Sequence, residues 1–180
     1  KEQIDEIIRL LEIEYPLAEC SLNYEKDYEL LFSTRLAAQC TDERVNKITP
    51  ALFKCFPTLE AFAGADVSEV EKYVHSCGFY RSKASDIIKC ARILLEKYNG
   101  RVPDTMEELL KLPGVGRKTA NLILGDVYGK PAVVVDTHCM RLSNRIGLVD
   151  NLKDPVKIEM ELRKILPPEK SSDFCHRLVL

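Results

Sequence analysis

The sequence has no run of apolar residues long enough to cross a membrane, and residues 1–13 lack the continuous apolar stretch of a secretion signal. It also contains no internal repeat and no low-complexity stretch. These absences argue against an integral membrane protein and a secreted one. They predict an intracellular protein, in the cytoplasm or nucleoid if the source is bacterial or archaeal. With 180 residues, 46% hydrophobic and 30% charged, the chain can fold as one domain or two small ones.

Cysteine pairs at metal-binding or redox spacing are also missing. The seven cysteines are odd in number and no two of them form a Cys-x-x-Cys motif; they stand at positions 20, 40, 55, 77, 90, 139 and 175. Most of their sequence neighbours are apolar. This pattern favours small buried hydrophobic side chains in a reducing compartment over a disulfide framework.

A large net charge is missing too, since the formal net charge is −2. The charges are unevenly distributed, however. Residues 1–30 carry three basic and nine acidic residues, a net of −6, whereas residues 109–147 carry six basic and two acidic residues, a net of +4. A partner with phosphate groups would therefore meet the second segment, although a solvated charged face is the simpler explanation of such an imbalance.

Helical signals dominate what is present, and they predict an all-α fold of short helices. Apolar residues recur at helical spacing, and capping residues or Gly and Pro stop signals separate the periodic segments. The apolar, β-branched residues 131–135 have no partner strand and are expected to form a buried extended segment. N-caps are predicted at Thr41, Asp66 (with Glu69), Thr105 (with Glu108), Asp136 and Asp154. Helices are expected over 4–11, 30–38, 42–55 with a kink near Pro50, from Asp66, 82–99, 105–112, 117–128, 136–145, 156–166 and from Phe174.

The last three residues, 178–180, are apolar and carry no helix stop signal. We therefore expect the sequence to be a fragment of a longer protein.

The most informative segment is a glycine turn between two of the expected helices, with the sequence Leu-Pro-Gly-Val-Gly-Arg-Lys-Thr-Ala at 112–120. Gly114 and Gly116 permit unusual backbone angles and close approach by another molecule. The turn and the first residues of the following helix carry amides without intrahelical acceptors. These amides can bind a DNA phosphate, helped by the positive end of the helix dipole. A simple turn between helices would also explain the two glycines.

Lys118 and Asp136 are the candidate catalytic residues. Lys118 falls in the first turn of a helix, where the dipole opposes a cation and favours the neutral amine, which is the nucleophile. Asp136 follows the buried segment and precedes a helix, so it is an N-cap that could also face the lysine and stabilise positive charge on a deoxyribose ring. A surface lysine that binds phosphate and a purely structural cap are the simpler alternatives.

These residues resemble the endonuclease III branch of the helix–hairpin–helix DNA glycosylases. The resemblance rests on Leu-Pro-Gly-Val-Gly-Arg-Lys-Thr-Ala-Asn at 112–121 and Val-Asp-Thr-His at 135–138. Ala-Gln-Cys-Thr-Asp at 38–42 and Gly-Phe-Tyr at 78–80, followed by Lys83 and Ala84, add to it. The order and spacing agree along nearly the whole chain.

The resemblance implies a monomeric base-excision repair enzyme that acts on oxidised pyrimidines or abasic sites in duplex DNA, with the damaged nucleotide flipped out of the helix. Lys118 would attack C1′ of the sugar, expel the base and form a Schiff base, and β-elimination would cut the strand. Asp136 would either activate the lysine or stabilise the oxocarbenium-like transition state. The implied layout is a six-helix domain at about 20–130, a second helical domain made of 1–19 and 131–180, and an active-site cleft between them.

The resemblance also implies which residues bind DNA. Gln39 corresponds to a position that fills the gap left by the flipped base, and Phe79 to a wedge position that is usually aliphatic. His138 is expected to form structural hydrogen bonds rather than to catalyse. Contacts with the DNA backbone are expected from the hairpin and from nearby basic residues, namely Gly114, Val115, Gly116, Arg117, Thr119, Arg141 and Arg145.

One departure concerns the [4Fe-4S] cluster that the family usually binds through Cys-x6-Cys-x2-Cys-x5-Cys. No cysteines here have that spacing, so the cluster is expected only in a full-length protein and no metal ligand is assigned in this chain.

Three other functions compete with this interpretation. A related adenine glycosylase usually lacks a lysine at position 118, and an 8-oxoguanine glycosylase fits the 135–138 motif less well. A non-catalytic helix–hairpin–helix DNA-binding module would need Gly114 and Gly116 but neither Lys118 nor Asp136.

Overall fold

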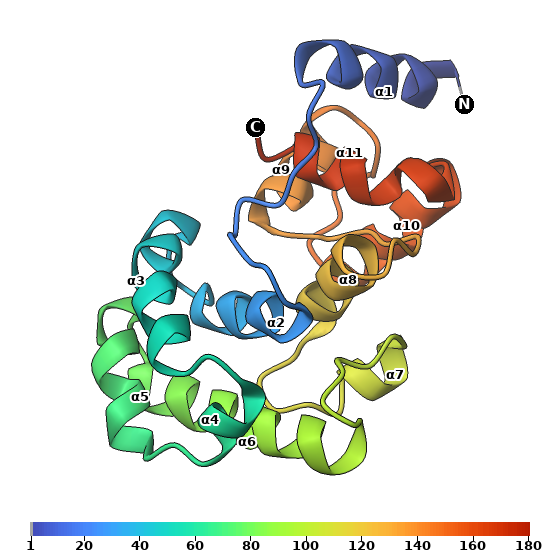
Figure 1. Ribbon diagram of the computed structural model, residues 1–180. Coiled ribbons are helices and arrows are strands. Elements are labelled where there is room, and N and C mark those ends of the chain that lie inside the picture. The colour runs from blue at the N-terminus through green and yellow to red at the C-terminus, as the bar shows by residue number, and fades with distance from the viewer. Residues whose placement is uncertain (1) are drawn as a thin grey trace. The chain divides into compact units, whose positions relative to one another are not determined.

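The computed structural model describes residues 2–180, and every regular element in that range is a helix (Figure 1). The predicted all-α class is therefore confirmed. None of the described helices is both long enough and apolar enough to span a bilayer.

The chain divides into two compact units. One unit comprises residues 21–119, and the other combines the residues up to Cys20 with residues 120–180. The division falls inside helix α8 (Arg117–Asp126), directly after Lys118 and Thr119.

The unit of residues 21–119 is built around α6 (Tyr80–Lys97), which packs against α2, α4 and α5 (Figure 1). Ala84, Ile87, Ala91 and Leu94 recur at helical spacing on α6 and are all buried, as expected for a helix in the middle of a core. The other elements of this unit are α2 (Asp27–Leu36), α3 (Asp42–Cys55), α4 (Leu59–Ala63), α5 (Val67–Val74), the 3-10 helix η1 (His75–Cys77) and α7 (Met106–Leu109).

Aromatic side chains fill part of this core. Phe62 is fully buried, and its ring centroid lies 5.2 Å from those of both Phe32 and Phe56. The pair with Phe32 is edge-to-face and the pair with Phe56 is stacked, and the ring quadrupole favours both geometries when the stacked rings are offset. These contacts join α2 and α4 and so help to fix the helix that leads to Gln39.

The second unit contains α1 (Glu2–Glu14), the remainder of α8, α9 (Thr137–Arg145), α10 (Pro155–Ile165), η2 (Pro168–Lys170) and α11 (Ser171–Arg177). Its core includes the predicted extended segment, since residues 132–135 are buried and non-helical. Close packing at Gly125 joins α8 to this segment and to α11. A Cβ placed at Gly125 would lie 2.6 Å from the Ser172 hydroxyl oxygen and 3.3 Å from the Ala132 Cβ.

Most predicted helix boundaries agree with the structure. The side chains of Thr41, Asp66, Thr105, Asp136 and Asp154 all accept a backbone N–H at the start of their helices, which confirms the five N-caps. The carboxylate of Glu69 pairs with Lys72. Helix α3 continues through Pro50, so that residue does not end it.

Two predicted helix starts were wrong. Helix α6 begins at Tyr80 rather than Ser82, because the backbone of Phe79 takes a left-handed conformation and accepts the first helical bond, from Lys83 N–H. Helix α11 begins at Ser171 rather than Phe174. The hydroxyl of Ser171 is buried and bonds to Ala132 N–H and Pro168 O instead of capping the helix. Helix α7 is also shorter than predicted and ends at Leu109.

All seven cysteines are free thiols. The prediction that they are buried is confirmed for Cys77, Cys90, Cys139 and Cys175, is wrong for the exposed Cys55, and holds only partly for Cys20 and Cys40. Burial is the main cause that raises the pKa of the Cys77 thiol to about 11 and that of Cys90 to about 12.

Candidate functional site

The glycine turn predicted at 113–116 lies between α7 and α8 as a hairpin. Val115 N–H donates to Leu112 O at 3.2 Å, which closes the turn. Gly114 has φ +72°, a left-handed conformation in which side chains other than glycine are disfavoured. The prediction of a tight turn here is confirmed.

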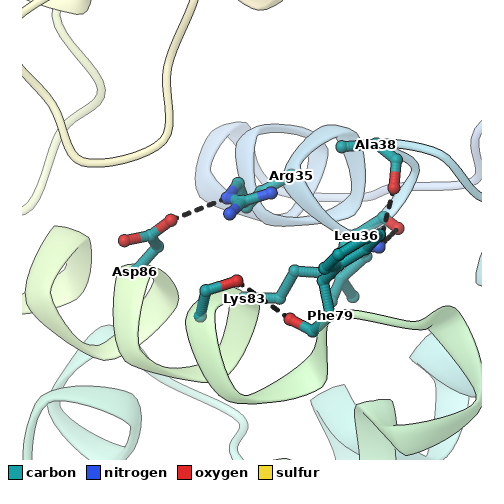
Figure 2. A network of polar contacts seen from close by, with 7 residues as sticks. Arg35, Leu36, Ala38, Phe79, Lys83 and Asp86 are labelled. Atoms are coloured by element: carbon teal, nitrogen blue, oxygen red, sulfur yellow. Dashed lines mark hydrogen bonds and ion pairs between the residues drawn. The ribbon is translucent and has the colours of Figure 1, made fainter.

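An ion pair from two other helices lies directly under Gly114. Arg35 of α2 donates from Nε to Asp86 Oδ2 of α6 at 2.8 Å (Figure 2). A Cβ at Gly114 would lie 2.5 Å from Arg35 Nε and 2.9 Å from Asp86 Oδ2. Only a residue without a side chain can therefore rest on this pair without displacing it.

The apolar residues of the hairpin fix its other side. Pro113 and Val115 border a small cavity together with Leu31 and Phe32 of α2 and Ile87 and Cys90 of α6. The hairpin is therefore seated on the same two helices through both an ion pair and apolar contacts, and its backbone is held in place before any ligand arrives.

The face of the hairpin at Gly116 is open. A Cβ built on Gly116 would meet no heavy atom within 4 Å. The first amides of α8, which begins at Arg117, have no intrahelical acceptor and lie at the positive end of the helix dipole. An anion can approach this point of the backbone without moving the protein.

Lys118 lies in the first turn of α8 and is exposed. Its ammonium group forms no hydrogen bond or ion pair with residues 21–119. Arg117 before it is half-buried, and Thr119 after it is buried. Of the three consecutive residues, Lys118 thus presents an accessible amine beside the open hairpin face.

Gln39 and Phe79 are exposed residues on unfavourable backbone. Gln39 has φ 54° and follows α2, whereas Phe79 has φ 46° and precedes α6. The Phe79 side chain is 67% exposed, although it is a large aromatic group. The other two non-glycine residues with positive φ among residues 2–180 are asparagines, which adopt this conformation more easily.

Lys83 connects these two turns, and sequence reasoning missed this role. Its side chain is fully buried, and its ammonium donates to Cys77 O at 2.9 Å. It also donates to Leu36 O at 2.9 Å and to Ala38 O at 2.8 Å (Figure 2). The signal in the sequence was a lysine on the apolar face of a helix, four residues before Ile87.

Asp136, in the second unit, caps α9. Its Oδ1 accepts from Cys139 N–H at 2.7 Å, and its second carboxylate oxygen accepts no hydrogen bond within residues 120–180. The buried segment 132–135 leads directly to Asp136, which is half-buried. One oxygen is therefore held by the helix and the other remains available.

The remaining predicted residues of α9 are exposed. His138 Nδ1 lies 3.3 Å from Arg141 Nη2, so the histidine serves as a hydrogen-bond partner as predicted. Arg145 is exposed in the last turn of the helix. Asn144 fixes this end of α9, because its amide bonds to Met140 O, Leu152 O and Leu152 N–H.

The structure groups the candidate residues within each unit. In residues 21–119 it joins the Gln39 and Phe79 turns at Lys83 and seats the hairpin on Arg35 and Asp86. In residues 120–180 it places Asp136, His138 and Arg141 along the first turns of α9. Lys118 belongs to the first unit and Asp136 to the second.

The residues described do not fit an iron–sulfur cluster, which requires four converging cysteine thiolates. Within residues 2–180 no three His, Cys, Asp or Glu side chains lie close enough together to hold a metal ion.

Comparison with known proteins identifies the family. Residues 32–168 match the HhH-GPD superfamily of base excision DNA repair proteins. Endonuclease III of Synechocystis sp. is 47% identical over 180 residues, which cover 99% of this chain and 82% of the relative. Endonuclease III of Escherichia coli K12 is 41% identical over 175 residues, which cover 97% and 82%.

Solved structures agree with the sequence comparison. A non-covalent endonuclease III–DNA complex matches with a TM-score of 0.94 at 40% identity, covering 99% of this chain and 83% of the other. A thermostable thymine-DNA glycosylase, at 24% identity and a TM-score of 0.84, shares the fold over 97% of this chain and 83% of its own. Together with the hairpin, Lys118 and the cap at Asp136, these matches show that the chain belongs to the endonuclease III family of helix–hairpin–helix enzymes, which are DNA glycosylases and AP lyases.

Proposed function

We propose that this chain excises oxidised pyrimidines from duplex DNA and then cuts the strand at the abasic site, with Lys118 as the nucleophile. The observation that carries the proposal is a lysine at the start of α8 that is exposed and has no polar partner among residues 21–119, next to a glycine hairpin whose backbone is open on one face. A structure of endonuclease III as a trapped covalent DNA intermediate, 40% identical to this chain, supports covalent chemistry in the family.

The hairpin would bind the DNA backbone. The amides at the start of α8 suit a phosphate oxygen, and the absence of a side chain at Gly116 lets the sugar–phosphate chain approach closely. The exposed Arg141 and Arg145 and the half-buried Arg117 would add charge-based contacts, with half-buried Val115 and the backbone amide of buried Thr119 completing the contact surface. Such contacts position the protein without reading sequence, and the affinity should fall as salt concentration rises.

The proposed reaction begins when the lone pair of Lys118 Nζ forms a bond to C1′ of the flipped nucleotide. The bond from C1′ to the base breaks, its electron pair leaves with the base, and the base takes up a proton. The nitrogen then loses one proton, and its lone pair forms the C1′=N bond as the C1′–O4′ bond of the sugar ring breaks. O4′ takes up a proton, which leaves a ring-opened, protonated Schiff base. Removal of a proton from C2′ then breaks the C3′–O bond, releases the 3′ strand as a 5′-phosphate, and leaves an imine that water hydrolyses.

Asp136 would contribute negative charge to this reaction. It either accepts a proton from the lysine or stabilises positive charge on the sugar as the base departs. Both roles require an ionised oxygen, and Oδ1 is already engaged by Cys139 N–H. The second oxygen is therefore the one assigned to the chemistry.

Borohydride trapping tests the role of Lys118. Wild-type protein incubated with thymine-glycol duplex DNA and borohydride should give a covalent protein–DNA product, because hydride reduces the Schiff base to a stable amine. Lys118→Ala should give none. Lys111→Ala is the matched control, since Lys111 is an exposed lysine of the same region and forms a surface ion pair with Glu107 at 3.5 Å. Undiminished trapping by Lys118→Ala would overturn the assignment.

Asp136→Asn tests the carboxylate separately from the cap. Asparagine retains an oxygen that can accept from Cys139 N–H, so α9 should stay capped while the charge is lost. We expect kcat for base removal to fall by roughly 10²-fold or more with DNA affinity nearly unchanged. Equal losses in binding and turnover would reduce Asp136 to a structural cap.

The lesion class and the layout belong to the same proposal. Excision of thymine glycol in preference to 8-oxoguanine, or to adenine opposite it, would support an oxidised-pyrimidine enzyme over the two related glycosylases. We also propose that the enzyme acts as a monomer, with functional domains at about 20–130 and at 1–19 plus 131–180.

A further inference from the structure

Lys83 is a buried cation with an unusual set of partners. Its side chain has no exposed surface, and no carboxylate of residues 21–119 forms an ion pair with it. Burial lowers the pKa of its ammonium group below the ordinary value, because a charge loses its hydration. An ammonium has three N–H donors, and here three backbone carbonyls accept them at 2.8–2.9 Å. A neutral amine could donate only two of these bonds.

The three carbonyls come from two segments far apart in the sequence. Leu36 and Ala38 stand at the end of α2, where carbonyl groups lack intrahelical donors and the dipole attracts a cation. Cys77 ends η1 and directly precedes the Gly78–Phe79 turn. One nitrogen atom on the first turn of α6 therefore holds both segments.

Each segment carries an exposed residue in strained backbone. Ala38 O directly precedes Gln39, and Cys77 O lies two residues before Phe79. Positive φ at a glutamine and a phenylalanine is unfavourable, and such residues persist where the surrounding structure over-determines them. The Lys83 ammonium supplies that restraint directly beside each strained residue.

We propose that Lys83 is a positioning residue that joins the Gln39 turn to the Phe79 turn, so that both side chains enter the DNA helix as one preorganised unit. The inference rests on the proposed function and on the roles that the family resemblance implies for Gln39 and Phe79, which would occupy the space left by the flipped nucleotide. Joining the turns removes the conformational entropy cost of ordering them separately during nucleotide flipping. Lys83 itself does not touch the DNA.

The proposal separates two activities of the same enzyme. Excision of thymine glycol from duplex DNA requires a flipped nucleotide and a filled gap. Cleavage of an abasic site in single-stranded DNA requires Lys118 but no gap to fill. A variant that loosens the two turns should therefore lose the first activity and keep the second, whereas general damage to the fold would reduce both.

The test uses Lys83→Met, which keeps the length of the side chain and removes the ammonium, with Lys89→Met as control because Lys89 is exposed on the same helix. For Lys83→Met we expect kcat/KM on duplex thymine-glycol DNA to fall by about 10- to 100-fold, because a displacement of positioning groups by about 1 Å can cost an enzyme up to about 100-fold in rate. Single-strand abasic cleavage should stay within about twofold of wild type. Lys89→Met should leave both activities unchanged.

A double-mutant cycle ties the effect to the two turns. In a chain that already carries Gln39→Ala and Phe79→Ala, Lys83→Met should cause little further loss on duplex DNA, because the groups it positions are gone. An additive loss, or an equal loss on single-stranded DNA, would overturn the proposal. Absence of trapping and cleavage by wild-type protein on duplex thymine-glycol DNA would instead refute the proposed function.

Lys83→Gln keeps the test decisive if the methionine variant does not fold, since an amide retains two N–H donors. It should show a smaller loss with the same preference for duplex DNA. If neither variant folds at any temperature, Lys83 serves the core as a whole rather than the two turns, and the proposal is wrong.

Discussion

Gly114→Ala should destabilise the protein markedly, whereas Gly116→Ala, two residues away in the same hairpin, should not. Gly114 has φ +72°, where any other residue costs about 1–2 kcal/mol. The added Cβ would also lie 2.5 Å from Arg35 Nε and 2.6 Å from Arg35 Cδ, so Arg35 must move and lose its 2.8 Å bond to Asp86.

The two costs can be added. The side chains of Arg35 and Asp86 are 21% and 25% exposed, so solvent screening reduces the value of their pair to about 1 kcal/mol. Gly114→Ala should therefore lower the free energy of unfolding by about 2–3 kcal/mol. Gly116 lies outside the left-handed region and has open space around it, so alanine there should change stability by no more than about 0.5 kcal/mol.

Urea denaturation followed by circular dichroism measures both changes. The cause can be isolated with Arg35→Ala, which removes the obstacle: in that background Gly114→Ala should cost only the backbone part, about 1–2 kcal/mol. The reasoning is refuted if Gly114→Ala lies within about 0.5 kcal/mol of wild type, or if Gly116→Ala is equally destabilising.

Three further predictions concern the open hairpin face, the packing of α8 and the cysteines. Gly116→Ala should weaken binding to abasic-analogue duplex DNA in fluorescence anisotropy, since the added methyl group projects where a phosphate would approach. The variant protein should keep the melting temperature of wild type, and unchanged affinity would mean that the DNA binds elsewhere. Gly125→Ala should lower the free energy of unfolding by about 1–3 kcal/mol, because the added methyl group clashes with the Ser172 hydroxyl. Adding Ser172→Gly to this variant should recover much of the lost stability in thermal melts, and no recovery would mean that the clash is relieved in another way. In native protein at pH 8 a thiol reagent should label the exposed Cys55 quickly and spare Cys77 and Cys90. The pKa values of about 11 and 12 leave at most roughly one of these buried thiols in a thousand ionised, and burial hinders access of the reagent. Rapid labelling of either buried thiol would contradict the packing.

Local chemistry made the hairpin and the caps predictable from sequence. A glycine turn between two periodic segments has few alternative conformations, and Asp136 behaves as a cap because a short acceptor before a helix satisfies its first amides. Lys118 could be placed in the first turn of α8 on the same grounds. These features depend on residues only a few positions apart.

Long-range contacts could not be predicted in this way. Arg35 and Asp86 are 51 residues apart, and nothing in either neighbourhood indicates that they meet beneath Gly114. Lysine is rarely fully buried, so the position of Lys83 contradicts the usual expectation for its type. The start of α6 was misplaced for a related reason, since the backbone of Phe79 begins that helix without a capping side chain.

The bond from Cys139 N–H to Asp136 Oδ1 has a consequence for how the enzyme meets its substrate. A side chain held through one oxygen cannot rotate to follow a moving sugar. The second oxygen of Asp136 therefore keeps a fixed position and orientation. In the proposed reaction the flipped nucleotide would then be the partner that adjusts. Lesions whose sugar cannot take up the position that this oxygen requires would be excised poorly even when their bases fit.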